Sequence, residues 1–270
     1  MPEPPFTNPI GAPFIELQSV DSTNNYALSQ VHANSLPDLP ERQTGRQSLV
    51  QHGTTFFAHE QVAGKGQRGK TWTTEKGANI ILSVVVKPAP LLLTQQFQLS
   101  ATVAVAIHKF FSNYAGTETK IKWPNDLYWQ DRKAGGILIE SVVGNKEPGG
   151  WKWAVVGIGI NINQTFFPVE LQNPVSLKQV TGHHSDTILL AKELCSILDE
   201  KYSQLVNEGF SSIYTQYLHH LYKRKELVKL KKDNRVFEAI LKTVLPTGRL
   251  VVEHLMEEEF GFGEVEWVIM

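Results

Sequence analysis

The chain has 270 residues, of which 41% are hydrophobic and 20% are charged, and its formal net charge is −1. This is a globular composition with room for one large domain, or for one large and one small domain. The near-zero charge gives no electrostatic argument for a nucleic-acid or membrane partner. Cys195 is the only cysteine, which excludes a disulfide framework within the chain and fits a reducing compartment.

The N-terminus has no basic segment followed by an apolar run, so it does not read as a signal peptide. The longest apolar stretches, 79–86 and 153–162, are too short to cross a bilayer as helices. We therefore expect a soluble, cytoplasmic protein.

Periodicity and turn residues predict alternating helices and strands up to about residue 221. Residues 1–13 are proline-rich without a periodic pattern, residues 21–24 are typical of a helix N-cap, and residues 36–46 of a surface loop. These patterns predict an α+β domain with a mixed or antiparallel sheet and helices on one face. The expected order is helix 24–32, strands 54–59 and 79–87, helix 94–114, strands 120–122, 127–130, 136–143 and 153–162 with turns at 131–132 and 147–150, then helices 187–206 and 211–221.

After Tyr222 the pattern changes to short strands separated by turns, at 226–230, 235–244, 249–254 and 263–269. An all-β unit of this length has the size of an SH3-like barrel and is marginally stable alone, so we expect it to dock on the larger domain. The predicted organisation is an N-terminal arm at 1–13, a large domain at 14–221 and a small SH3-like domain at 222–270.

Residues 64–72 read Gly-Lys-Gly-Gln-Arg-Gly-Lys-Thr-Trp, a glycine-rich basic segment. Its three glycines let backbone amides converge on an anion without a Cβ in the way, and Lys65, Arg68 and Lys70 add positive charge. The segment suits a phosphate or carboxylate, and a flexible basic surface loop is an equally good interpretation. We expect neither a Walker A loop nor a dinucleotide-binding fingerprint.

A second motif is Lys-Trp-Pro-Asn-Asp at 122–126, followed by Lys133 and two glycines just past a tight turn. A lysine in that position can hold a carboxylate and an α-phosphate together as charge builds between them. Asp126 can bind a magnesium ion or orient a lysine. The alternative interpretation is a solvated hairpin.

A third motif places Gly157 and Gly159 in an otherwise apolar strand that continues to Asn161. Alternating glycines weaken a strand unless something must approach its backbone closely. A flat hydrophobic ligand is one explanation, and a β-bulge or tight packing is another. The hydroxyls of Ser22 and Thr23 can likewise bond a small polar ligand, or serve only as an N-cap.

Taken together and in this order, the motifs resemble those of the biotin–protein ligase family. The resemblance runs from about residue 15 to 163 and more loosely through the C-terminal unit. It implies a catalytic domain related in fold to class II aminoacyl-tRNA synthetases, at 14–221, and then the SH3-like domain. The matching segments are Asp-Ser-Thr-Asn at 21–24, Gln61 with 64–72, Lys-Trp-Pro-Asn-Asp at 122–126, Lys-x-x-Gly-Ile-Leu at 133–138 and Gly-x-Gly-x-Asn at 157–161.

The resemblance implies an ATP-dependent ligase. It makes biotinyl-5′-AMP and pyrophosphate from biotin and ATP, then transfers biotin to a lysine of the biotin carboxyl carrier domain of a biotin-dependent carboxylase. Lys133 is the expected catalytic residue, and Mg²⁺ is expected with ATP, with Asp126 as its candidate ligand. The implied biotin-binding residues are Ser22, Thr23, Asn24, Gln61, Gly64, Lys65, Gln67, Lys133, Gly157 and Gly159, and those for ATP or the adenylate are Lys65, Gln67, Arg68, Lys70, Trp72, Asn125, Asp126, Ile137 and Asn161.

The chain departs from the family pattern in two places. Lys65 and Gln67 stand where many members have arginine; Gln67 carries no charge, and lysine is not equivalent to arginine at a bidentate site. Some members also carry an N-terminal helix-turn-helix domain, which the segment before Phe14 is too short to hold. We therefore expect a ligase without a DNA-binding domain and without a DNA or membrane partner.

Three alternatives remain open. A lipoate–protein ligase-type acyltransferase has the same fold and carrier type, although residues 64–72 and 122–126 belong to the biotin branch. A non-catalytic biotin sensor need not keep Lys133. Nucleic-acid binding by the basic run 223–232 is the third, although such runs are usually solvated faces.

Overall fold

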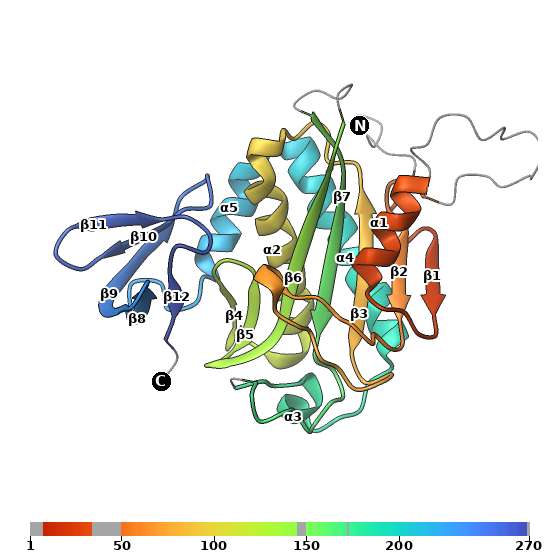
Figure 1. Ribbon diagram of the computed structural model, residues 1–270, viewed down its shortest axis with the longest axis horizontal. Helices are drawn as coiled ribbons and strands as arrows, with labels where there is room; N and C mark the ends of the chain where they lie inside the picture. The colour runs from red at the N-terminus through yellow and green to blue at the C-terminus, as the bar shows by residue number, and fades with distance from the viewer. Residues whose placement is uncertain (1–7, 34–49, 145–149, 172, 269–270) are drawn as a thin grey trace, which may run out of the picture.

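The computed structural model describes residues 8–33, 50–144, 150–171 and 173–268 (Figure 1). Its first part contains β1 (Phe14–Leu17), α1 (Thr23–Ala33), β2 (Thr55–Ala58), the 3-10 turn η1 (Gln67–Gly69), β3 (Ile80–Val86), the 3-10 turn η2 (Leu93–Gln95), α2 (Gln96–Ala115), β4 (Thr119–Lys122), β5 (Asp126–Trp129), β6 (Arg132–Val143), β7 (Trp151–Ile160), α3 (Leu177–Thr181), α4 (Thr187–Glu208) and α5 (Phe210–His219). Its C-terminal part contains β8 (Leu227–Lys232), β9 (Arg235–Val244), β10 (Leu250–Glu253), β11 (Glu257–Phe260) and β12 (Glu266–Trp267).

The strands form two sheets. The first is seven-stranded with the order β1-β2-β3-β7-β6-β5-β4, and the second is five-stranded with the order β11-β10-β9-β8-β12. β1 pairs with β2 in parallel, whereas the other neighbours in the first sheet pair antiparallel. The prediction of an α+β fold with a mixed sheet and a small C-terminal β unit is therefore confirmed.

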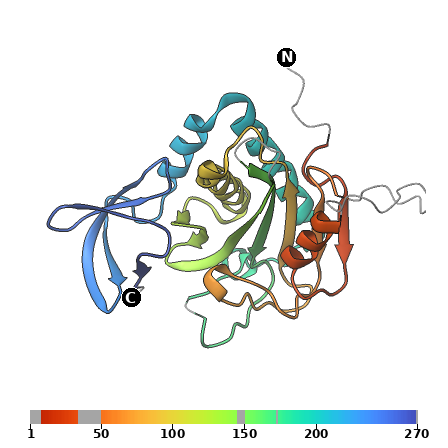
Figure 2. The ribbon, with the colours of Figure 1, turned by 45° about the horizontal axis from the view of Figure 1, so that its top comes forward.

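Helices cover both faces of the large sheet, so the prediction of helices on one face was wrong. Leu82 and Val84 of β3 join the main core with α2 and α4, while Val85 between them packs against Ala27 and Val31 of α1. β3 is buried on both faces, which explains its continuous apolar sequence. Figure 2 shows α1 on one side of the sheet and α2, α4 and α5 on the other.

The boundaries of the predicted elements agree with the structure to within a few residues. Among the described α-helices and strands, β1, α3 and β11 were not predicted. The predicted loop at 36–46 and most of the predicted turn at 147–150 lie outside the described residues. The described end of the N-terminal arm, residues 8–13, packs on the large part, since Ile10 is buried and its backbone amide donates to Asp199 Oδ1 at 2.8 Å.

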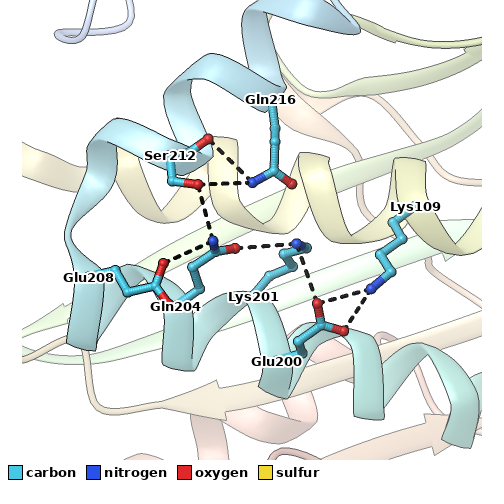
Figure 3. A network of polar contacts seen from close by, with 7 residues as sticks. All are labelled: Lys109, Glu200, Lys201, Gln204, Glu208, Ser212 and Gln216. Atoms are coloured by element: carbon cyan, nitrogen blue, oxygen red, sulfur yellow. Dashed lines mark hydrogen bonds and ion pairs between the residues drawn. The ribbon is translucent and has the colours of Figure 1, made fainter.

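A network of polar side chains ties α4 to α2 and α5 on the helical side of the molecule (Figure 3). Lys109 of α2 donates to both carboxylate oxygens of Glu200, at 2.9 and 2.7 Å. The buried Lys201 reaches Gln204, which in turn donates to Ser212 Oγ of α5 at 3.1 Å. This network belongs to the scaffold rather than to the site described below.

The C-terminal sheet docks on the large part, as expected. Val228, Leu230 and Leu241 belong to the same core cluster as α2 and the large sheet, and Tyr214 of α5 donates to the carbonyl of Val244 at 2.7 Å. The boundary at residue 222 stays a prediction, because Tyr222 is itself joined to β4 through its amide. In the described parts of the chain, no helix is both long and apolar enough to span a membrane.

Candidate active site

The candidate site lies on the α1 side of the large sheet, where one row of residues crosses five strands. Lys122 on β4 is opposite Asp126 on β5, which is opposite Gly136 on β6, then Gly159 on β7 and Ile81 on β3. Directly opposed residues of antiparallel strands project from the same face of a sheet. The row therefore places two charged side chains, two glycines and one apolar residue along a single surface.

A β-bulge brings Lys133 to this surface. The register of β5 and β6 shifts at Tyr128, so that Asp126 opposes Gly136 while Tyr128 opposes Lys133. One extra residue in a strand reverses the alternation of its side chains, so Lys133 and Gly136 face the same way although they are three positions apart. Lys133 Nζ consequently lies 2.7 Å from Asp126 Oδ1 and 5.9 Å from the centre of the Trp72 ring.

The two glycines of β7 form a floor on which other side chains rest. A Cβ on Gly157 would lie 2.3 Å from Asn24 Oδ1, and a Cβ on Gly159 would lie 2.5 Å from the Trp72 indole. The close approach that the sequence predicted is therefore made here by two of the protein's own side chains, and glycine is required at both positions.

One end of the site is a buried polar cluster around the start of α1. The Gln61 Oε1 atom accepts hydrogen bonds from the Thr23 amide at 2.7 Å and from its hydroxyl at 3.1 Å. Ser83 Oγ lies 2.7 Å from Thr23 Oγ1 and 2.6 Å from Asn24 Oδ1, and Asn24 Nδ2 donates to Glu140 Oε2 at 2.7 Å. The role of these side chains goes beyond a simple N-cap, because they link the helix to β3, to β6 and to the segment that carries Gln61.

Ser83 and Glu140 were absent from the predicted site. Ser83 is fully buried within the apolar strand β3, and Glu140 pairs with Asn24 from β6. A lone hydroxyl in a run of aliphatic residues was the available signal for Ser83, because a buried polar group requires a hydrogen-bond partner. Nothing in the sequence indicated Glu140.

The glycine-rich segment forms a hairpin over the sheet. Lys65 and Thr71 are joined by an antiparallel bridge, and the Gly66 amide donates to the Lys70 carbonyl at 2.7 Å. The hairpin turns at Arg68, whose φ of 55° is left-handed, and in Figure 1 it crosses in front of β6. Residues 64–71 also spell Gly-x-x-x-x-Gly-Lys-Thr, but a P-loop leads into a helix and this hairpin does not, which confirms that the segment is not a Walker A loop.

Two buried polar atoms at the site have no partner among the described residues. Gln67 Nε2 and Asn125 Nδ2 both donate to the Ile137 carbonyl, at 3.1 and 2.7 Å, but Gln67 Oε1 and Trp72 Nε1 bond to nothing. Buried polar atoms without partners are rare and costly. One acceptor and one donor are thus available to a bound ligand.

The structure brings most of the predicted residues together around one pocket. Its lining also includes Gly66, Ile81, Gly136, Leu138 and Ile158, which were not predicted. The predicted residues that line it are Ser22, Thr23, Asn24, Gln61, Lys65, Gln67, Trp72, Asn125, Lys133, Ile137, Gly157 and Gly159.

Five predicted residues lie outside the lining. Gly64 lies against Trp72 and Gln61, and Asp126 pairs with Lys133. Arg68 and Lys70 are exposed on the hairpin. The side chain of Asn161 donates to the carbonyls of Val175 and Lys133, at 3.1 and 3.4 Å, so in this structure it supports the backbone next to the site.

The charges of the lining suit an anionic or polar organic ligand. Lys65 and Lys133 are its cations, and none of the lining residues is an aspartate or glutamate. The described residues contain no group of three or more His, Cys, Asp or Glu side chains that could hold a metal ion. The arrangement can neutralise a carboxylate or phosphate over a floor of glycines, beside a cluster of neutral hydrogen-bonding groups.

Comparisons with known proteins point to one family of ligases. A family model described as the biotin/lipoate A/B protein ligase family matches residues 20–161. The bifunctional ligase/repressor BirA of Bacillus subtilis (strain 168) is 33% identical over 165 residues, which are 60% of this chain and 49% of that protein. The biotin–[acetyl-CoA-carboxylase] ligase of Paracoccus denitrificans is 28% identical over 202 residues, or 73% of this chain and 82% of that one.

Solved structures show the same fold. The biotin protein ligase from Aquifex aeolicus, solved in complex with biotin and ATP, is similar with a TM-score of 0.74 at 22% identity, covering 98% of this chain and all of that chain. The ligase from Leishmania major in complex with biotinyl-5-AMP gives a TM-score of 0.53 at 21% identity, covering 92% and 98%. The chain spans about half the length of the BirA relatives from Bacillus that it matches.

Proposed function

The chain belongs to the biotin/lipoate A/B protein ligase family, and on that premise we propose that it is an ATP-dependent biotin–protein ligase. It activates the carboxylate of biotin with ATP and transfers the biotinyl group to a lysine of a carrier protein. The observation that carries the proposal is the Lys133–Asp126 pair at 2.7 Å, beside a pocket with a glycine floor and no carboxylate in its lining.

In the first step, a carboxylate oxygen of biotin attacks the α-phosphorus of ATP, and the bond to the β-phosphate breaks. Biotinyl-5′-AMP and pyrophosphate are the products. The Lys133 ammonium supplies a fixed positive charge where negative charge builds between the two reactants, and Asp126 orients it. A preorganised charge stabilises the transition state because it needs no reorganisation during the reaction.

The polar cluster of Thr23, Gln61 and Ser83 suits the ureido end of biotin. That group carries both N–H donors and a carbonyl acceptor, and the cluster offers hydroxyls and an amide that can supply the opposite partner. Gly157 and Gly159 line the same pocket, and Asn24 and Trp72, which lie against them, border the space for the flat ring system. Selectivity for biotin follows from hydrogen bonds between the ureido group and this cluster, since a ligand without a ureido group leaves the cluster's buried polar atoms unpaired.

The hairpin 64–72 and Trp72 serve the adenylate. The unpaired Trp72 Nε1 can donate a hydrogen bond to the ligand, and the unpaired Gln67 Oε1 can accept one. Arg68 and Lys70 bring positive charge near the phosphates. A hairpin that lies over the pocket keeps water from the reactive anhydride. The adenylate end of the pocket also includes Asn125, which donates to the Ile137 carbonyl. Asn161 supports this end by donating to the backbone carbonyl of Lys133.

Magnesium enters with ATP as part of the substrate. Asp126 is the carboxylate nearest to Lys133 and is already paired with it. The described side chains here therefore do not form a set of ligands for a resident metal ion. Mg²⁺ commonly keeps several waters and is held by substrate phosphates with one or two carboxylates. We assign no chemical step to the metal.

In the second step, the amine of a carrier lysine attacks the acyl carbon of biotinyl-5′-AMP, and AMP leaves. The chemistry requires an acceptor protein whose lysine reaches the pocket, which we propose is the biotin carboxyl carrier domain of a carboxylase. Use of ATP and the single buried cysteine are consistent with the cytoplasm.

The test is pyrophosphate exchange into ATP by the purified protein, with biotin, with lipoate and without an acid. Exchange that depends on biotin alone supports the proposal. Exchange with lipoate keeps the mechanism and changes the substrate, as the family description allows. Biotin binding without any exchange indicates a sensor and contradicts the proposal.

A further inference from the structure

Lys122 is a buried cation that the proposed reaction does not yet use. It is the first residue of the row that crosses the sheet, directly opposite Asp126, and it is only 6% exposed. Because opposed residues share a face, its side chain lies on the same side of the sheet as Lys133. β4 is two strands away from β6, which is roughly 10 Å at about 4.8 Å per strand.

The surroundings of Lys122 hold a positive charge without neutralising it. Its Nζ lies 4.8 Å from the centre of the Tyr128 ring and 5.0 Å from that of Trp267, which belongs to β12. Among the described residues, no oxygen accepts a hydrogen bond from this ammonium. Cation–π contacts compensate only part of the cost of burying a charge.

An excess of positive charge gathers at this end of the row. The charge of Lys122 interacts with those of Asp126, Lys133 and Lys70, and burial lowers its pKa to about 8, so it is still protonated near neutrality. Asp126 is already engaged with Lys133 at 2.7 Å. Lys122 and Lys133 thus flank one carboxylate, that of Asp126, an arrangement that an anion with two or more negative charges would balance.

We propose that Lys122 binds the β- and γ-phosphates of ATP and then the pyrophosphate product, and that Trp267 positions it. The inference rests on the proposed function, since Lys133 marks the reacting carboxylate and Lys122 lies beyond it, away from the polar cluster around Thr23. Biotin and the reacting carboxylate are already assigned to other parts of the site, so the β- and γ-phosphates of ATP are the part of the substrates left for this position. Its charge matches the local excess.

Trp267 is suited to a positioning role because it also holds the backbone next to Lys122. Its indole Nε1 donates to the Trp123 carbonyl at 3.1 Å, while the Trp123 indole donates to the Gly248 carbonyl at 2.9 Å. These two bonds fix residues 122 and 123 against the C-terminal sheet. β12 thereby contributes a wall to the phosphate end of the site.

The experiment compares Lys122→Met with Lys192→Met, which removes the same charge from an exposed position on α4. Equilibrium titrations measure the dissociation constants of biotin, AMP, ATP and inorganic pyrophosphate. We expect Lys122→Met to weaken ATP and pyrophosphate binding about tenfold, the loss of one charge-assisted contact, and to leave biotin and AMP within about twofold. Lys192→Met should match the wild type.

Unchanged ATP and pyrophosphate affinities in a folded Lys122→Met variant would overturn the inference. So would an equal loss for all four ligands, which indicates a structural role, or a wild-type protein that binds no pyrophosphate. Trp267→Leu should raise the KM for ATP without changing the KM for biotin; equal changes in both would remove Trp267 from the positioning role. The binding titrations do not require turnover and therefore test the role of Lys122 alone. A lack of pyrophosphate exchange would refute the proposed function and would be seen in a separate assay.

Discussion

Lys133 and Asp126 form a partly exposed pair, with side-chain exposures of 33% and 17%. Such a pair contributes little to stability, because both charges remain accessible to water and ions. Its importance lies in where it fixes the ammonium, next to the pocket and below Trp72. A substitution at residue 133 should therefore separate activity from folding.

We expect Lys133→Ala to reduce biotin-dependent pyrophosphate exchange by about 10²- to 10³-fold, the usual cost of removing a preorganised charge. The melting temperature should stay close to that of the wild type. Exchange kinetics and thermal unfolding check the two expectations, with the exposed Lys192→Ala as control. Near-normal exchange in a folded variant would remove Lys133 from the catalytic role.

Gly159 and Gly136 allow a matched test of the glycine floor, because they oppose each other on adjacent strands. A Cβ at residue 159 meets the Trp72 ring at 2.5 Å, whereas the nearest atom to a Cβ at residue 136 is Asp126 Oδ1 at 3.5 Å. Gly159→Ala should therefore displace the indole and weaken biotin binding, with little effect of Gly136→Ala on stability. Calorimetric titration of biotin and melting curves of both variants provide the measurement, and equal behaviour would contradict the steric argument.

The sequence was sufficient to find Lys133 but not to orient it. Strict alternation from Gly136 places residue 133 on the face covered by α2 and α4, and only the register shift at Tyr128 returns it to the α1 side, where the site lies. Ser83 escaped prediction for a related reason, because its partners Thr23 and Asn24 lie about 60 residues away in the chain. Long-range pairing of this kind leaves no local pattern.

At the scale of elements, the hairpin 64–72 lies over the pocket with its three cations exposed to solvent. Lys65, Arg68 and Lys70 are exposed, and Arg68 lies against Gly263 and 4.0 Å from Glu266 in the C-terminal part. Such segments are the ones that ligands order.

We predict that trypsin cleavage after residues 65, 68 and 70 slows when biotin and ATP are both present, because the adenylate bonds to the two unpaired polar atoms of the hairpin, Gln67 Oε1 and Trp72 Nε1. Mass spectrometry of timed digests gives the rates. Cleavage at exposed lysines of the C-terminal sheet, such as Lys231, provides the internal reference. Equal rates with and without ligands would exclude closure of the hairpin.

Elements with strong periodicity were predicted, and those defined by their neighbours were not. β9 was predicted with its observed bounds, and α4 to within two residues, since ten residues of α4 are buried at helical spacing. β11 contains three consecutive glutamates and exists because it pairs with β10, and the four-residue β1 exists because β2 binds its edge. Pairing compensates for unfavourable composition only once the fold is formed.

At the scale of the whole molecule, the junction between α2 and the end of α5 contains stacked histidines. The rings of His108 and His220 are 3.8 Å apart, and His108 Nε2 lies 3.0 Å from the Thr119 carbonyl. Burial lowers the pKa of both histidines to about 4, and the nearby His219 and Lys120 act in the same direction. Burial lowers the pKa of His52 similarly.

A histidine that is neutral when folded and has an ordinary pKa near 6.5 when unfolded stabilises the protein above pH 6.5. That contribution is lost as the pH falls from 6.5 towards 4, because the unfolded state binds the proton. For the buried His108 we expect a loss on the order of 1–2 kcal/mol at pH 5, and less for the half-buried His220. Melting temperatures at pH 7.5, 6 and 5 should fall steadily, with a shallower slope for His108→Gln. A flat profile would contradict the assignment.

The association of the two sheets was predictable only in outline. A small β unit was expected to dock, but the bonds from Trp123 to Gly248 and from Trp267 to Trp123 join residues 125 and 144 positions apart. No spacing rule links them. They were found only because the fold brings the last strand of the chain against the Lys-Trp-Pro-Asn-Asp motif.

The position of Trp72 gives the protein a built-in optical signal. Its ring rests on Gly159 with Nε1 unbonded, whereas Trp123 and Trp151 are almost completely buried elsewhere in the core. Indole emission responds to the polarity around the ring and to the hydrogen bond of its N–H. Filling the pocket changes both for Trp72, so entry of biotin is expected to be visible in the fluorescence of the unlabelled chain, and this change should vanish in Trp72→Phe.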